Sequence, residues 1–194
     1  MKRLLILFLV ILGLVNFSFA QESGTMKKAV MVISHEGFRD EELLHTKQAL
    51  ERNAINVKVA STDLSEAEGS LGARIKPDIL FSNINMADFD AIIFVGGPGG
   101  VSYWDDPLAH KLLKEADSSG KIIGGICSAS VTLAKSGILK NKRATVFPGD
   151  SQELIDNQVN YTAKDVERDG FIITANGPAS ARAFGEELAK ALKE

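Results

Sequence analysis

Short apolar runs alternate with amphipathic stretches along this chain, and no other feature of the sequence limits its fold as strongly. Apolar runs that end in turn residues are typical of strands buried on both faces of a sheet. The clearest are KAVMVIS at 28–34, NVKVAS at 56–61, AIIFV at 91–95 and KIIGGI at 121–126. Between them, 40–52 and 107–118 carry apolar residues at helical spacing. This order predicts an α/β fold with a mainly parallel central sheet and helices on both faces.

The remaining segments complete one domain. Residues 69–82 interrupt the alternation and are predicted to form a small hairpin or excursion. The second half is predicted to hold strands at 144–147, 161–167 and 171–174, helices at 130–135 and near 151–157, and a last helix from about 178 to 193. No repeat or linker divides the sequence, so a single domain is expected over residues 26–194.

The first 20 residues differ in kind from the rest and predict a secretory signal peptide at 1–20. A positive start and a mainly apolar run at 4–15 precede small residues at Ser18 and Ala20. This run is too short for a retained membrane anchor, which needs about 20 apolar residues. We therefore expect an exported protein, periplasmic or secreted, with no stable membrane span after cleavage. Met26, which two lysines follow, offers an alternative start that would yield a cytosolic form.

Charge and residue spacing exclude two classes of partner. Cleavage after Ala20 removes two of the 22 basic residues and none of the 25 acidic ones, which leaves a net charge of −5. No basic stretch remains that would neutralise the phosphates of a nucleic acid. One cysteine and three scattered histidines (His35, His45 and His110) do not have the spacing of a metal site. Neither nucleic acid nor a metal is expected.

The only cysteine, Cys127, lies in the sequence GICSA at 125–129, after an apolar strand and before a helical run. This is the form of a nucleophile elbow, in which small residues on both sides of the nucleophile allow a sharp turn. The positive end of the helix would lower the thiol pKa from its usual value of about 8.5. Nearby backbone N–H groups would stabilise an oxyanion. The alternative is a buried cysteine that serves only packing.

Two further segments follow buried strands, where ligands collect in parallel α/β sheets. GGPGG at 96–100 allows close backbone approach, but it lacks the glycine spacing and the lysine of a nucleotide-binding loop, so nucleotide binding is excluded. GFRDEELL at 37–44 begins a helix with acidic residues, which the helix dipole favours. Glu42 directly precedes two leucines, which favours an inward-facing side chain.

Together these motifs resemble the ThiJ/PfpI family. The resemblance rests on GF at 37–38 with Asp40 and Glu42, VGGPG at 95–99, GGIC at 124–127, AKSGILK at 134–140, DG at 169–170 and NGP at 176–178. It covers the whole mature chain and implies a flavodoxin-like three-layer sandwich of the class I glutamine amidotransferase-like type. Similar proteins are homodimers, so the resemblance implies a homodimer here.

The resemblance also implies site residues. It pairs Cys127 with a buried carboxyl at Glu42, and it assigns backbone N–H donors to Gly97 and Ser128. An ionised carboxylate beside a thiol raises the pKa of the thiol. A reactive thiolate therefore requires a protonated Glu42 that donates a hydrogen bond.

Two positions depart from the family pattern. Members with peptidase-like function carry a histidine directly after the cysteine, where this chain has Ser128. Members that act on glyoxals carry a histidine before a proline, where this chain has Phe147. Both functions lose a proton-transferring group by these changes. His35, at the end of the first predicted strand, is the best placed substitute as an auxiliary residue.

These residues predict a cysteine-dependent enzyme, glyoxalase-like or deglycase-like, that acts on small reactive carbonyls or glycated adducts without a cofactor. Cys127 would be the nucleophile and Glu42 the proton shuttle. A second class also fits: a redox sensor or chaperone-like protein whose Cys127 is oxidised to a sulfinate that Glu42 stabilises. A peptidase-like or amidase-like hydrolase would require His35, or a residue of a partner subunit, to complete the site.

Overall fold

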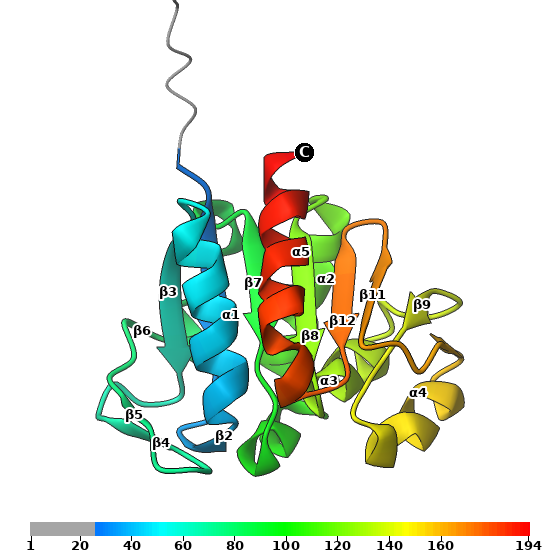
Figure 1. Ribbon diagram of the computed structural model, residues 1–194, viewed down its shortest axis with the longest axis horizontal. Coiled ribbons are helices and arrows are strands. Elements are labelled where there is room, and N and C mark those ends of the chain that lie inside the picture. The colour runs from blue at the N-terminus through cyan, green and yellow to red at the C-terminus, as the bar shows by residue number, and fades with distance from the viewer. Residues whose placement is uncertain (1–25) are drawn as a thin grey trace, which may run out of the picture.

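The computed structural model describes residues 26–194, so the predicted signal peptide at 1–20 lies outside the described residues. Its centre is a seven-stranded sheet with the strand order β11-β12-β8-β7-β1-β3-β6 (Figure 1). The strands are β1 (Lys28–Val32), β3 (Asn56–Ser61), β6 (Ile79–Leu80), β7 (Ala91–Phe94), β8 (Ile122–Ile126), β11 (Val166–Asp169) and β12 (Ile172–Ala175). Neighbouring strands are parallel except β11 and β12. The predicted α/β fold with a mainly parallel sheet is confirmed.

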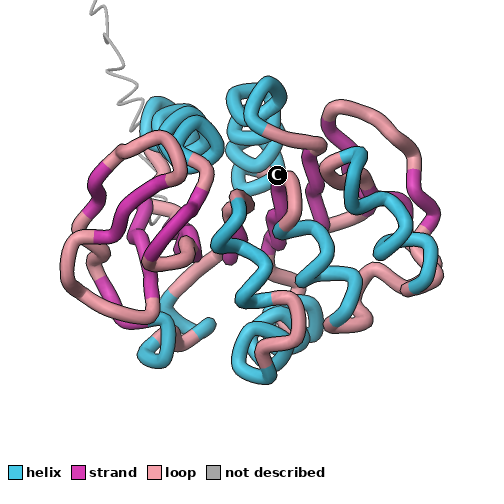
Figure 2. Tube along the Cα trace, turned by 90° about the horizontal axis from the view of Figure 1, so that it is seen from below, coloured by secondary structure: helices cyan, strands magenta, loops and turns pink. Residues whose placement is uncertain are grey.

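Helices cover both faces of this sheet, which becomes the middle of three layers (Figure 1, Figure 2). One face carries α1 (Asp40–Arg52) and α5 (Ala181–Lys193), and the other carries α2 (Pro107–Ser118) and α3 (Ala129–Lys135). The strands supply both cores because successive side chains point to opposite faces. Met31 belongs to one buried cluster with Phe184 of α5, whereas Val30 belongs to the other with Leu113 of α2.

Two smaller units flank the main sheet. β2 (Glu36–Phe38), β4 (Ala67–Gly69) and β5 (Arg74–Ile75) form a three-stranded sheet, and β9 (Arg143–Ala144) pairs with β10 (Asn160–Tyr161) next to α4 (Ser151–Asp156). The excursion predicted at 69–82 begins at the end of β4 and contains β5, which pairs antiparallel with β4, and β6, which joins the main sheet. Short 3-10 turns occupy 81–83, 86–88, 98–103, 148–150 and 178–180.

Three predicted strands differ from the structure by two or more residues. The strand predicted at 28–34 ends at Val32. The continuous strand predicted at 161–167 is wrong, because its two ends pair in different sheets, β10 with β9 and β11 with β12. Lys164 lies in the loop between β10 and β11. Its carbonyl accepts a hydrogen bond from the hydroxyl of Thr145 at 2.6 Å, which fixes this loop. The strand predicted at 144–147 is only β9, since Pro148 begins a 3-10 turn.

The start of α1 is fixed by contacts to two loops. The buried carboxylate of Asp40 accepts hydrogen bonds from the backbone N–H groups of Leu71 (2.9 Å) and Ala73 (2.6 Å), which ties the helix to the β4–β5 turn. The N–H of Arg39 donates to the carbonyl of Gly96 at 2.9 Å, which ties it to the turn after β7. These bonds set the position of Glu42, less than one helical turn further on.

The packing of α5 on α1 predicts the effect of Gly185→Ala. Alanine normally stabilises a helix interior by about 1 kcal/mol relative to glycine. Here a Cβ atom at position 185 would lie 2.6 Å from the Cβ of Ala49 and 3.0 Å from the carbonyl oxygen of Thr46. Because a backbone cannot yield as a flexible side chain can, we expect a net destabilisation of about 1–3 kcal/mol. Urea unfolding followed by circular dichroism measures it.

Arg182→Ala is the matched control, because Arg182 lies on the same helix and is exposed. This variant should unfold within about 0.5 kcal/mol of the wild type. A Gly185→Ala protein that is more stable than the wild type would show that α1 and α5 are not packed as closely as described.

Candidate active site

Cys127 lies at the turn between β8 and α3, in the centre of the main sheet. Its φ is +59°, a left-handed conformation that is strained for a residue with a side chain. The turn is held by the neighbouring strand, because the N–H of Cys127 donates to the carbonyl of Ala175 at 2.8 Å. On the other side of the turn, the indole N–H of Trp104 donates to the carbonyl of Ser128 at 2.9 Å. The strain aims the thiol out of the turn, as a nucleophile elbow requires.

Glu42 is fully buried on the first turn of α1. Its Oε2 atom accepts a hydrogen bond from the N–H of Gly96 at 3.0 Å, and its Oε1 atom has no hydrogen-bond partner within residues 26–194. Gly96 lies between the side chains of Cys127 and Glu42. A Cβ atom added there would lie 2.8 Å from the Cβ of Cys127 and 2.9 Å from Oε2 of Glu42. Any side chain at this position would therefore push the thiol and the carboxyl apart.

Burial controls the protonation of this pair. It raises the pKa of Glu42 to about 7, against the opposing effects of Cys127, the Gly96 N–H group and the charge of Arg39. Burial also raises the pKa of Cys127 to about 12, with a further contribution from the negative charge of Glu42. Near neutral pH, both the protonated and the ionised form of Glu42 are therefore populated.

The thiol pKa corrects one prediction from the sequence. The helix after the elbow was expected to lower it, and the backbone N–H groups of Ser128 and Gly97 do act in that direction. Burial and the carboxylate of Glu42 act more strongly in the opposite direction, so the thiol pKa is raised. Protonation of Glu42 removes the repulsion, which leaves the N–H groups to favour the thiolate.

The pair opens into a pocket of about 450 Å³. It is lined by Arg39, Glu42, Gly97, Pro98, Val101, Cys127, Ser128, Phe147, Asp150 and Pro178. Four of the predicted site residues, Glu42, Gly97, Cys127 and Ser128, thus meet at one place. Phe147 is 47% exposed and forms an apolar wall where a histidine was considered from the sequence. The pocket is large enough for a small organic molecule.

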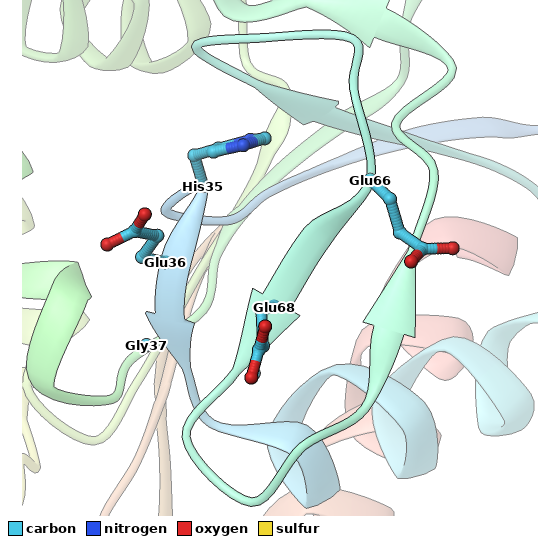
Figure 3. Close-up of a pocket in the computed structure, with 6 residues that line it drawn as sticks. His35, Glu36, Gly37, Glu66 and Glu68 are labelled. Carbon is cyan, nitrogen blue, oxygen red and sulfur yellow. The ribbon is translucent and has the colours of Figure 1, made fainter.

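His35 does not line this pocket. It lies beside β2 in a separate pocket of about 420 Å³ with Glu36, Glu66 and Glu68, which Figure 3 shows. There its Nε2 atom is 3.4 Å from the hydroxyl of Ser65, and its ring and the side chain of Glu36 leave the backbone in opposite directions. The prediction that His35 assists Cys127 gains no support from this position.

The other two histidines are also outside the pocket. His45 is exposed on α1, and Nε2 of His110 is 2.8 Å from the carbonyl of Trp104. Within residues 26–194, no group of three or more histidine, cysteine, aspartate or glutamate side chains has the arrangement of a metal site. Proton transfer in the pocket therefore depends on the thiol and on carboxyl groups.

Residues 27–191 match the DJ-1/PfpI family. The chain belongs to this family. An uncharacterized protein of Methanocaldococcus jannaschii is 37% identical over 203 residues, which cover 100% of this chain and 98% of that protein. The crystal structure of a ThiJ/PfpI domain protein from Brachyspira murdochii matches with a TM-score of 0.85 and 34% identity, covering 88% of this chain and 98% of that one. The ThiJ/PfpI resemblance and the flavodoxin-like three-layer fold are thus confirmed.

Two other DJ-1/PfpI relatives carry names that state an activity. A deglycase of Pyrococcus abyssi is 28% identical over 164 residues, which cover 84% of this chain and 99% of that protein. A glutathione-independent glyoxalase of Caenorhabditis elegans is 28% identical over 170 residues, which cover 88% of this chain and 91% of that protein.

Sequence reasoning missed two charged residues of this DJ-1/PfpI pocket. Arg39 was passed over because it stands among acidic residues that are typical of a helix start, and its guanidinium does bind Glu41 at 2.8 Å. Asp150 stands two residues after Pro148, in what reads as an ordinary polar turn. The only signal in the sequence was its short distance from Phe147.

The raised pKa of Glu42 predicts a pH dependence of stability. Since the folded-state pKa of about 7 lies above the ordinary value, folding favours the protonated form. The associated stability is fully present below the unfolded pKa and is lost as pH rises through about 7, by about 3 kcal/mol in the limit. Between about pH 5 and pH 8 the wild type should therefore lose more thermal stability than Glu42→Gln, whose amide does not titrate.

Melting curves at several pH values measure this difference, with Glu41→Gln as the control. Glu41 is the sequence neighbour of Glu42, but its pKa is lowered and its side chain is partly exposed. Parallel pH profiles for the wild type and Glu42→Gln would show that the carboxyl of Glu42 titrates as an ordinary exposed one.

Proposed function

We propose that the protein is a cysteine-dependent enzyme that converts small reactive carbonyl compounds, such as 2-oxoaldehydes or their adducts with amines and thiols. The observation that carries this proposal is the thiol of Cys127 beside the buried carboxyl of Glu42, in a pocket open to small molecules. Relatives over most of the chain are named deglycase and glyoxalase, which supports an activity of this DJ-1/PfpI type.

The first step is addition of the thiol to the aldehyde carbon. The proton of Cys127 passes to the carboxylate of Glu42 as the carbon–sulfur bond forms, and the carbonyl electron pair moves to oxygen. The N–H groups of Gly97 and Ser128, which lower the pKa of the thiol, would bind this oxyanion. Glu42 then returns the proton to the oxygen, which completes a hemithioacetal.

The second step moves the hydrogen on that carbon to the neighbouring carbon. The ionised Glu42 removes it as a proton, its electron pair forms an enediol, and reprotonation of the second carbon yields a thioester on Cys127. The aldehyde carbon is oxidised and its neighbour is reduced, so no external oxidant and no cofactor takes part. Water releases the product as a 2-hydroxy acid. A carboxyl whose pKa is close to neutral serves both as acid and as base.

A redox sensor or chaperone-like role is the second candidate. Two equivalents of peroxide would oxidise the thiol to a sulfinate with release of water. The unpaired Oε1 atom of Glu42 favours this candidate, since a protonated carboxyl would have a free donor for a sulfinate oxygen. A peptidase-like or amidase-like role has less support, because no histidine of residues 26–194 lines the pocket.

The proposed setting is outside the cytosol, as a homodimer. Export follows from the signal-peptide pattern at 1–20. Among residues 26–194, none of the helices has both the length and the apolar character needed to cross a bilayer. Self-association is supported by two exposed leucines near the start of α1: Leu71, whose N–H binds Asp40, and Leu44.

Native mass spectrometry of the protein expressed with its full N-terminus tests this setting. We expect a dimer whose subunits have lost residues 1–20 and which is recovered from the cell envelope or the medium. Full-length subunits in the cytosol would contradict export, and a monomer at micromolar concentration would contradict the dimer.

Turnover of methylglyoxal tests the enzymatic proposal. Cys127→Ala should abolish formation of lactate, because the covalent adduct cannot form, and Glu42→Gln should reduce it by about 100-fold or more, because proton transfer is lost. His35→Ala is the control and should keep wild-type activity, since His35 lines another pocket.

Equal turnover by the wild type and Cys127→Ala would refute the enzymatic proposal. In that case, mass spectrometry after mild peroxide treatment decides on the second candidate. A selective gain of two oxygen atoms on Cys127, reduced in Glu42→Gln, would support the redox sensor.

A further inference from the structure

Asp150 presents a second carboxyl group to the pocket that holds Cys127 and Glu42. It ends the turn at 148–150 and occupies the N-cap position of α4, where an aspartate side chain usually accepts a hydrogen bond from the helix backbone. Here the side chain makes no such bond. It also forms no hydrogen bond or ion pair with any other residue of 26–194. Its carboxylate is therefore free to bind a molecule in the pocket.

The charges around Asp150 leave it unpaired. Burial raises the pKa of Asp150, and repulsion by Glu153 in the first turn of α4 raises it further. Lys135 of α3 is engaged by Glu153 at 3.7 Å and by Asp105 at 3.2 Å. Arg39 lines the same pocket, but both of its contacting nitrogens bind Glu41, at 2.8 Å and 3.2 Å.

Release of the product needs a base that is in contact with water. Release of a thioester from Cys127 requires a water molecule that loses a proton as it attacks the acyl carbon. Glu42 is fully buried and its Oε2 atom accepts a hydrogen bond from Gly96, whereas Asp150 is partly exposed to solvent at the wall of the same pocket. The side chain of Phe147 carries no group that accepts a proton.

We propose that Asp150 is the general base that activates the water which releases the product from Cys127. This inference rests on the proposed function. The water oxygen bonds to the acyl carbon while its proton passes to the carboxylate of Asp150. The carbon–sulfur bond breaks, and its electron pair returns to sulfur, which receives the proton of the newly formed carboxylic acid through the ionised Glu42. Asp150 then gives its proton to solvent, and the 2-hydroxy acid leaves.

Asp150→Asn with methylglyoxal as the probe tests this step. Samples quenched with acid over time are analysed by intact mass for an adduct on Cys127, and lactate is measured in parallel. We expect a rapid burst of one adduct per subunit, followed by turnover that is roughly 100-fold slower than in the wild type. In the wild type the adduct should decay faster as pH rises through the ionisation of Asp150, and the variant should lack this limb of the profile.

Three further variants serve as controls. Asp150→Glu should restore part of the adduct decay, because a carboxylate is kept. Asp156→Asn removes another carboxylate of α4, which does not line the pocket, and should keep wild-type decay. Asp150→Ser lacks the base in the same way as the asparagine variant, so it replaces that variant if its melting curve shows loss of folding.

The outcomes separate this inference from the function on which it rests. Wild-type decay of the adduct in a folded Asp150→Asn or Asp150→Ser protein would overturn the inference and leave the enzymatic proposal standing. Loss of adduct formation itself in these variants would also overturn it, since Asp150 would then act before release. Absence of any adduct in the wild type, with full turnover by Cys127→Ala, would refute the proposed function instead.

Discussion

The close approach of Cys127 and Glu42 on either side of Gly96 is the constraint on which the site depends. It brings together three segments that are far apart in the sequence: the first turn of α1, the turn after β7 and the elbow after β8. Each is held by a bond to its neighbour, such as the N–H of Arg39 to Gly96 and the N–H of Cys127 to Ala175. The parallel sheet makes this possible, because the carboxyl ends of β7, β8 and β12 lie side by side.

The burial of Glu42 and the strained backbone of Cys127 both lower the stability of the folded protein. A carboxyl group in a fully buried position beside a thiol has its pKa raised to about 7, and a non-glycine residue at φ +59° adds backbone strain of about 1–3 kcal/mol. Both costs are met by extensive apolar packing on the two faces of the sheet. The result is a thiol whose ionisation depends on the protonation of one neighbour.

The sequence predicted most of the fold because periodicity is a local property. The helices at 40–52 and 107–118 and the strand at 56–61 have the predicted bounds. The continuous strand at 161–167 failed because pairing partners in two different sheets, not local pattern, divide it. In the same way, Cys127 and Glu42 stand in recognisable motifs, whereas the direction of a side chain in a turn is set by tertiary contacts. For this reason His35 was placed nearer to the thiol than it is, and Asp150 was missed.

The two departures from the family pattern have distinct physical consequences. The hydroxyl of Ser128 donates to the carbonyl of Gly97 at 3.2 Å, so this side chain joins the two segments that supply the oxyanion donors. Phe147 replaces a proton-transferring group with a half-exposed aromatic ring. Ser128 therefore makes the oxyanion site more rigid, whereas Phe147 leaves the pocket without an imidazole. A pocket built in this way carries out proton transfer through carboxyl groups, and its pH dependence is set by how deeply each carboxyl is buried.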